Sequence, residues 1–61
     1  MIIDVMMDIY GDELYIKESN MVINGINTAG YIAQSEDGET IATAPTWDEI
    51  TTKAEKIGFR F

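Results

Sequence analysis

The sequence predicts an α+β fold: an antiparallel sheet of about four strands, formed by two β-hairpins, followed by one C-terminal helix packed on one face. Three observations predict it. Residues 2–10 alternate between apolar and other side chains, as a half-buried strand does. Gly11-Asp12 and Asp37-Gly38 are turn dipeptides between apolar runs. Residues 46–57 place apolar side chains at helical spacing behind a capping residue.

The first hairpin is expected over residues 2–18. Its predicted inner face carries Ile3, Val5, Met7 and Ile9, and its predicted outer face carries Asp4, Met6, Asp8 and Tyr10. A two-residue turn at Gly11-Asp12 pairs Ile9 with Leu14 and Met7 with Ile16. The apolar face then stays continuous across the hairpin.

The second hairpin is expected over residues 31–44, after an irregular segment over 19–30 that contains the turn dipeptide Asn24-Gly25. Met21-Val22-Ile23 either extends the preceding strand past a bulge or begins a new one. The register of the second hairpin stays open, because Ala33 pairs with Ala42 across a two-residue loop and with Ile41 across a three-residue loop. Its alanines predict that the helix packs closely over it.

The helix is predicted over residues 46–57. Thr46 is its N-cap, and Glu49 completes a capping box three residues later. The apolar stripe consists of Trp47, Ile50, Ala54 and Ile57. Gly58 is expected to end the helix and begin a short tail over 58–61, where Phe59-Arg60-Phe61 can add an edge strand. The whole chain is predicted to be a single domain, 1–61.

Residues 30–58 resemble a known family unit. Gly30-Tyr31-Ile32-Ala33, a glycine turn, Thr40-Ile41-Ala42 and Thr46-Trp47-Asp48-Glu49-Ile50 are similar to the strand–hairpin–helix unit of small HicB-like antitoxin domains. The similarity covers less than half of the chain, and the longer loop that those domains carry between the hairpin strands is absent. The resemblance implies an antitoxin-like alternative, with no functional residue carried over.

Composition limits the chemistry of the chain. Eleven acids and four bases give a net charge of −7, and there is neither cysteine nor histidine. Disulfides and thiolate or imidazole metal sites are therefore excluded, and we expect no cofactor. The acidity disfavours direct binding to nucleic acid or to anionic membranes. We expect a soluble cytoplasmic protein, in the host cytoplasm if the chain is viral, and self-association is one partner option.

The same composition predicts that the chain is not an enzyme. Ser19 and Ser35 lie beside turns with no imidazole to activate them. The acid pairs Asp8 with Asp12 and Glu36 with Asp37 lack the ligand spacing of a calcium-binding loop. We therefore expect neither catalytic residues nor a metal site.

The leading hypothesis is a small acidic protein-binding module, a regulator or inhibitor of the kind that phages encode, which covers a basic surface of a partner protein. The predicted contact residues are Asp4, Met6, Asp8, Tyr10, Glu13 and Tyr15. The alternatives are a nucleic-acid mimic, a structural homo-oligomer joined through a strand edge, and the antitoxin-like protein. Asp4 and Asp8 are expected ~13 Å apart, whereas DNA carries a charge every ~1.7 Å, so mimicry needs two hairpins or two subunits to combine.

Overall fold

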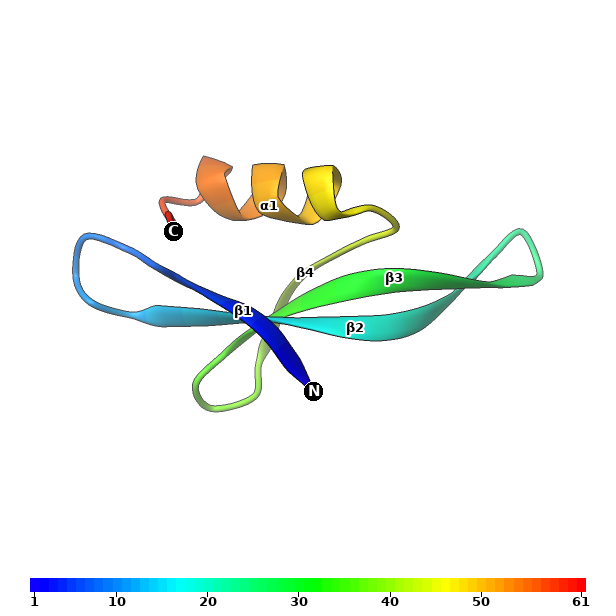
Figure 1. Cartoon of the computed structure of the whole chain (residues 1–61), viewed down its shortest axis with the longest axis horizontal. Helices are drawn as coiled ribbons and strands as arrows, with labels where there is room; N and C mark the ends of the chain where they lie inside the picture. The colour runs from blue at the N-terminus through cyan, green and yellow to red at the C-terminus, as the bar shows by residue number, and fades with distance from the viewer.

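The computed structural model describes all residues from 1 to 61 as one antiparallel sheet and one helix. The elements are β1 (Ile2–Met7), β2 (Glu13–Ile23), β3 (Ile26–Ser35), β4 (Thr40–Ala44) and α1 (Trp47–Lys56). Each strand pairs with the next in chain order, and α1 lies across one face of the sheet (Figure 1). The predicted α+β fold class is confirmed.

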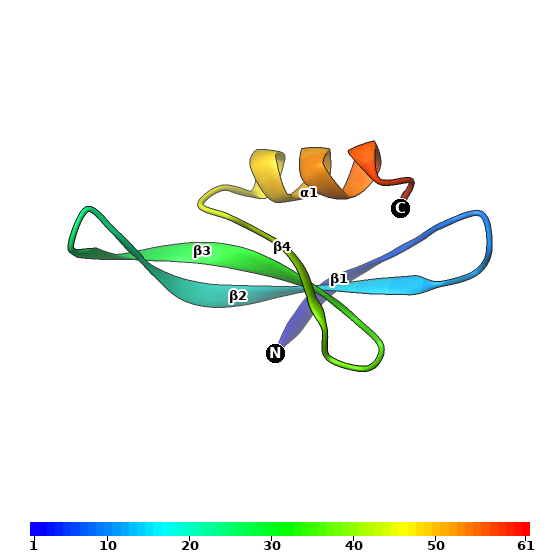
Figure 2. The same cartoon turned by 180° about the vertical axis from the view of Figure 1, so that it is seen from behind.

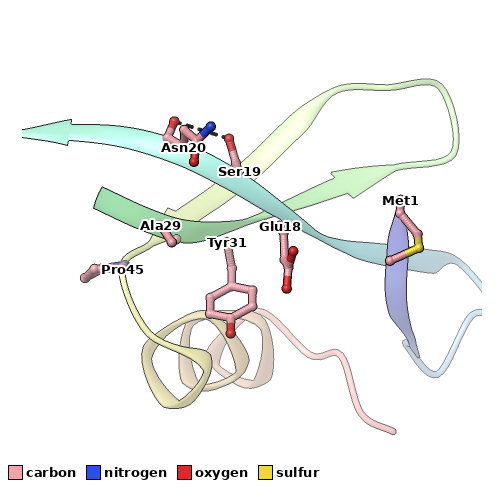
Figure 3. Close-up of a pocket in the computed structure, with 8 residues that line it drawn as sticks. Met1, Glu18, Ser19, Asn20, Ala29, Tyr31 and Pro45 are labelled. Carbon is pink, nitrogen blue, oxygen red and sulfur yellow. Dashed lines mark hydrogen bonds between the residues drawn. The ribbon is translucent and has the colours of Figure 1, made fainter. Parts of the chain in front are cut away.

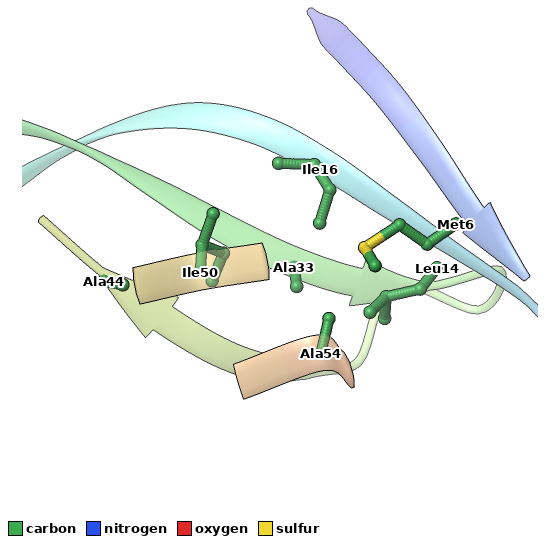
Figure 4. Packing of buried hydrophobic residues seen from close by; sticks show 7 residues of the cluster. All are labelled: Met6, Leu14, Ile16, Ala33, Ala44, Ile50 and Ala54. Carbon is green, nitrogen blue, oxygen red and sulfur yellow. The ribbon is translucent and has the colours of Figure 1, made fainter. Parts of the chain in front are cut away.

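The core lies between α1 and one face of the sheet, which we call the covered face. Its buried apolar residues come from all four strands and the helix: Met6, Leu14, Ile16, Ala33, Ala44, Ile50 and Ala54 (Figure 4). The small side chains at Ala33 and Ala44 allow the helix to approach the sheet, as their sequence positions predicted. Only nine of the 61 residues are buried, so the core is small even for a short chain.

The first hairpin has a different register from the predicted one. Met6 pairs with Leu14 and Met7 pairs with Glu13, so the predicted pairing of Met7 with Ile16 is wrong. The difference is three residues, an odd number, and it turns every side chain of the strand to the opposite face. Met6 is therefore fully buried, whereas Met7 is 48% exposed.

The reason for this register is a longer turn. The Asp8 carboxylate accepts hydrogen bonds from the backbone N–H groups of Tyr10 and Asp12, both at 2.9 Å. Gly11 adopts a φ of +84° and donates to the Asp8 carbonyl. The side chain of Asp8 thus stabilises a loop over residues 8–12 in place of the predicted two-residue turn, and Ile9 is left in solvent.

The segment over residues 19–30 is regular, not irregular as predicted. β2 runs on to Ile23 and β3 begins at Ile26, with Ile23 and Ile26 paired across a tight turn. Asn24 and Gly25 both have positive φ, +51° and +78°, the conformation that the Asn-Gly dipeptide favours in hairpins. The result is a two-stranded arm that projects beyond the helix (Figures 1 and 2).

The second hairpin contains both registers that the sequence left open. Gln34 pairs with Thr40, the register of a three-residue loop, while Ala33 pairs with Ala42, the register of a two-residue loop. A bulge between these pairs absorbs the difference. The loop itself repeats the first turn, because Gly38 has a φ of +87° and Glu39 N–H donates to the Ser35 hydroxyl.

The helix begins and ends as predicted. The Thr46 side chain accepts from Glu49 N–H at 3.2 Å. Gly58, at φ +104°, donates to the Glu55 carbonyl, and Phe59 N–H reaches back to Ala54, which is a Schellman ending. Ile57, predicted in the apolar stripe, is instead more than half exposed, because it is the C-cap residue, where the backbone leaves the helical conformation.

Both edges of the sheet meet groups from the C-terminal part of the chain. Arg60 forms a single β-bridge with Met7, through backbone hydrogen bonds of 2.7 and 2.8 Å, on the outer side of β1. This bridge confirms the predicted pairing of the tail. At the opposite edge, Lys53 Nζ donates to the carbonyl of Thr43 in β4 at 2.8 Å. Partners of this kind reduce the exposure of an edge strand to pairing with another chain.

Candidate functional site

The antiparallel topology brings two acidic turns to the same end of the sheet. The turn between β1 and β2 and the turn between β3 and β4 both lie at the end opposite the arm (Figures 1 and 2). We call this region the acidic end, and its acids are Asp8, Asp12, Glu13, Glu36, Asp37 and Glu39. None of the four basic residues lies in either turn. The acidic end therefore concentrates six of the eleven acids, and the basic residue beside it is Arg60, whose backbone pairs with Met7.

Two of these acids have structural duties in their turns. Asp8 holds the first turn through its carboxylate. In the second turn, the Ser35 hydroxyl donates to the Asp37 carboxylate. This hydrogen bond, together with the backbone N–H groups of Asp37 and Glu39, lowers the pKa of Asp37 below its ordinary value. Asp37 therefore stays ionised to lower pH than a free aspartate.

The acidic end also exposes apolar side chains. Ile9 is 89% exposed and Tyr10 is 82% exposed, and both lie at the tip of the first turn between Asp8 and Asp12. Tyrosine is enriched in the energetically important parts of protein interfaces. Large apolar groups surrounded by carboxylates are suited to contact with a protein surface that is both basic and partly apolar.

The two turns act electrostatically on the same tyrosine. Partial burial, followed by the carboxylates of Glu13 and Glu36, raises the pKa of Tyr15 above its ordinary value. Glu13 begins β2 and Glu36 follows β3, so the negative charges of both hairpins act together near Tyr15.

The structure separates the six residues that the sequence grouped as a contact surface. Met6 lies in the core, so its predicted exposure is wrong. Asp4 pairs with Ile16 from the edge strand β1 and lies outside the acidic end. Asp8, Tyr10 and Glu13 belong to the acidic end, and Tyr15 lies next to it on the sheet. The acids of the second turn were not in the predicted set, because sequence alone did not fix which turns share an end.

The face of the sheet opposite α1 is a second notable surface, which we call the open face. Directly opposite residues of paired strands share a face, and the register assigns sixteen residues to this one: Ile2, Val5, Met7, Glu13, Tyr15, Lys17, Ser19, Met21, Ile23, Ile26, Thr28, Gly30, Ile32, Gln34, Thr40 and Thr43. No second layer covers it (Figures 1 and 2). Most of its side chains are half-buried by their neighbours alone.

A shallow pocket of about 440 Å³ lies beside the base of the arm (Figure 3). Glu18 and Tyr31 project from the sheet on its helix side, and Ser19 and Asn20 form its rim. The Ser19 hydroxyl donates to the carbonyl of Asn20 at 3.5 Å. The pocket lining contains one carboxylate and no basic side chain, so it brings together no acid–base pair.

No three or more acidic side chains gather closely enough to hold a metal ion. The helix α1 is neither long nor apolar enough to cross a membrane. Comparisons with known proteins found no matching family model, no matching curated protein and no matching solved structure.

Proposed function

We propose that this chain is a small acidic protein-binding module, a regulator or inhibitor, whose acidic end covers a basic surface of a partner protein. The observation that carries the proposal is that six acids lie at one end of the sheet, where Ile9 and Tyr10 are exposed at the tip of one of the two turns. Opposite charge accelerates association, and the aromatic tip supplies apolar contact area. The three hydrogen-bonded bases Lys17, Lys53 and Arg60 donate to neutral oxygens, so these bonds leave the carboxylates free for a partner.

The test is a matched pair of charge reversals. The first variant carries Asp12→Lys, Glu36→Lys and Glu39→Lys, which changes acids of the acidic end that hold no turn through their side chains. The control carries Asp4→Lys, Glu18→Lys and Glu55→Lys, outside that end. Each set of three reversals adds six charges and takes the net charge from −7 to −1.

Partner capture from the native host cell, followed by titration of the captured partner, provides the measurement. We expect the first variant to lose at least about tenfold in affinity and the control to lose much less, with unchanged circular dichroism for both. Equal losses in the two variants would show that only net charge matters and would reject the acidic end as the contact site. Tyr10→Ala should weaken binding further.

A second candidate function, nucleic-acid mimicry, is favoured by one observation. Mimicry requires acids from two hairpins to combine, and the two acidic turns do lie at one end of the sheet. The twist of the sheet spreads these turns apart (Figure 1), so the spacing of the charges is looser than that of a DNA backbone. If the captured partner binds duplex DNA, a competition experiment tests mimicry. Duplex DNA is added to the complex of this chain with its partner, and failure of the DNA to displace the chain excludes mimicry.

A further inference from the structure

The open face carries few charged side chains. Among the strand positions assigned to it, the charged residues are one acid, Glu13, and one base, Lys17. Glu36, which follows β3 and acts on Tyr15, adds one negative charge beside these strands, so the face carries a net charge of about −1 in a chain of net charge −7. A second copy of the chain is therefore repelled less by this face than by the acidic end.

Groups from the C-terminal part of the chain occupy part of both outer edges of the sheet. Arg60 already bridges the outer side of β1, and Lys53 occupies a carbonyl on β4. Pairing through a strand edge, one of the hypotheses from sequence, would meet these contacts on β1 and β4, whereas the edges of the arm, at residues 18–23 and 26–30, are unpaired. The open face meets no such obstacle, and it carries the apolar side chains Ile2, Val5 and Ile32.

The positions of the two charges select one arrangement. Glu13 and Lys17 lie on the same face of β2, two residues before and two residues after Tyr15, so each is ~7 Å from it along the strand. A two-fold axis that crosses the strands at Tyr15 exchanges these positions. Each Glu13 then faces Lys17 of the other copy. A two-fold axis parallel to the strands would instead place Glu13 opposite Glu13.

We propose that a second copy of this chain covers the open face, with the two β2 strands stacked antiparallel about a two-fold axis beside Tyr15. The interface is isologous, because the same patch serves both copies. The arrangement also places each acidic end over the neutral arm of the other copy, where Ser19, Met21 and Thr28 lie. The two acidic ends lie at opposite ends of the dimer, and of their six acids only Glu13 takes part in the interface.

The size of the face predicts a weak dimer. Four strands ~4.8 Å apart and a six-residue strand of ~20 Å outline roughly 400 Å². A standard interface buries ~800 Å² on each partner. An interface of this size belongs to the weak and transient class. This proposal is independent of the proposed function, because it is tested on the purified chain alone.

The test is a charge swap followed by sedimentation equilibrium from ~10 μM to ~1 mM. Lys17→Glu and Glu13→Lys each create two like-charge contacts across the axis, and we expect each to weaken the dimer at least about tenfold. The double variant E13K/K17E restores both opposite-charge pairs and should return to within about threefold of the natural chain.

The control variants Lys56→Glu and Glu55→Lys make the same changes in net charge on the exposed side of α1. They should leave the dimer within about twofold of the natural chain. A natural chain that is monomeric at ~1 mM overturns the proposal. If the single reversals leave the dissociation constant of the dimer unchanged, this interface is wrong. It is also wrong if the double variant does not restore the dissociation constant of the natural chain. Circular dichroism on each variant confirms that it is folded. Because the two single variants change the net charge in opposite directions, they test the charge pairing independently of net charge.

Discussion

The covered face and the open face of the sheet are formed by alternate residues of the same strands, yet only one of them has a layer over it. Leu14 and Ile16 lie fully buried under α1, while Tyr15 between them lies half-buried on the other side. In β1 the neighbours Met6 and Met7 divide in the same way. The difference shows that hydrophobicity alone does not decide which face becomes the core. The helix buries the face whose small residues, Ala33 and Ala44, leave room for it.

The two faces also differ in what they contribute to the molecule. The covered face holds the fold together through apolar burial, which stabilises by about 1.5–3 kcal/mol for each large side chain. The open face adds little burial of its own, and it keeps Tyr15, Ile32 and Val5 available for contact with another molecule. Substitutions at matched positions on the two faces measure this difference.

The largest effect is expected at the pair of adjacent methionines. Met6→Ala removes a fully buried side chain and should destabilise the fold by about 2–5 kcal/mol. Met7→Ala, on the open face, should cost less than about 1 kcal/mol. Urea denaturation of dilute protein followed by circular dichroism measures both values. Equal losses would mean that the register of β1 in solution differs from the one described.

A smaller effect is expected at Gly30, where the open face is closely packed. A methyl group on Gly30 would lie 2.9 Å from Met21 Cγ and 3.0 Å from the Ala44 carbonyl oxygen. Gly30→Ala should therefore destabilise the fold by about 1–3 kcal/mol.

The thioether of Met21 can move aside, whereas the Ala44 carbonyl belongs to the backbone. The double variant Gly30→Ala with Met21→Ala separates the two contacts in a double-mutant cycle. Recovery of most of the loss in the double variant would assign it to Met21. No recovery would assign it to the backbone of β4.

The smallest effect is electrostatic. Glu13→Gln removes one of the carboxylates that raise the pKa of Tyr15, so this pKa should fall toward 10.0, although partial burial and Glu36 still raise it. Glu18→Gln, on the other side of β2, should leave it unchanged. Absorbance titration in a background of Tyr10→Phe and Tyr31→Phe isolates the signal of Tyr15, at a concentration low enough to keep the chain monomeric.

The direction of the linked stability change follows from the raised pKa. The folded state holds the Tyr15 proton more tightly than the unfolded state does. Stability is therefore lost as pH rises from about 10.0 through the folded pKa of Tyr15. Glu13→Gln should make this alkaline loss smaller. An unchanged pH profile would mean that Glu13 does not act on Tyr15.

Much of the fold could be predicted from local sequence signals. Thr46 and Gly58 defined the helix ends because capping depends on a few neighbouring atoms. The Asn24-Gly25 turn was recognised for the same reason. The length of the strands on either side of this turn could not be predicted. Ser19 and Asn20 are weak strand formers, and they are held in β2 by their pairing with β3.

The candidate site was harder to predict, because its residues come together only through pairing. The alternation of residues 2–10 predicts a strand position for Asp8, whereas its role as a turn acceptor depends on backbone N–H groups whose positions the sequence does not give. The turn that this side chain stabilises gives the strand a different register from the predicted one, and this register places Met6 in the core. The acids of the second turn joined the site only because the strand order places both turns at one end.

The bridge between Met7 and Arg60 has a consequence for the order of folding. The strands of this meander pair with their neighbours in sequence, so their contacts form over short loops and at little entropic cost. The bridge joins residues 53 positions apart (60 minus 7), almost the whole chain. Any of the hairpins can form first, but the bridge forms only after the C-terminal residues have packed beside β1. Removal of the last two residues should therefore accelerate unfolding much more than it slows folding.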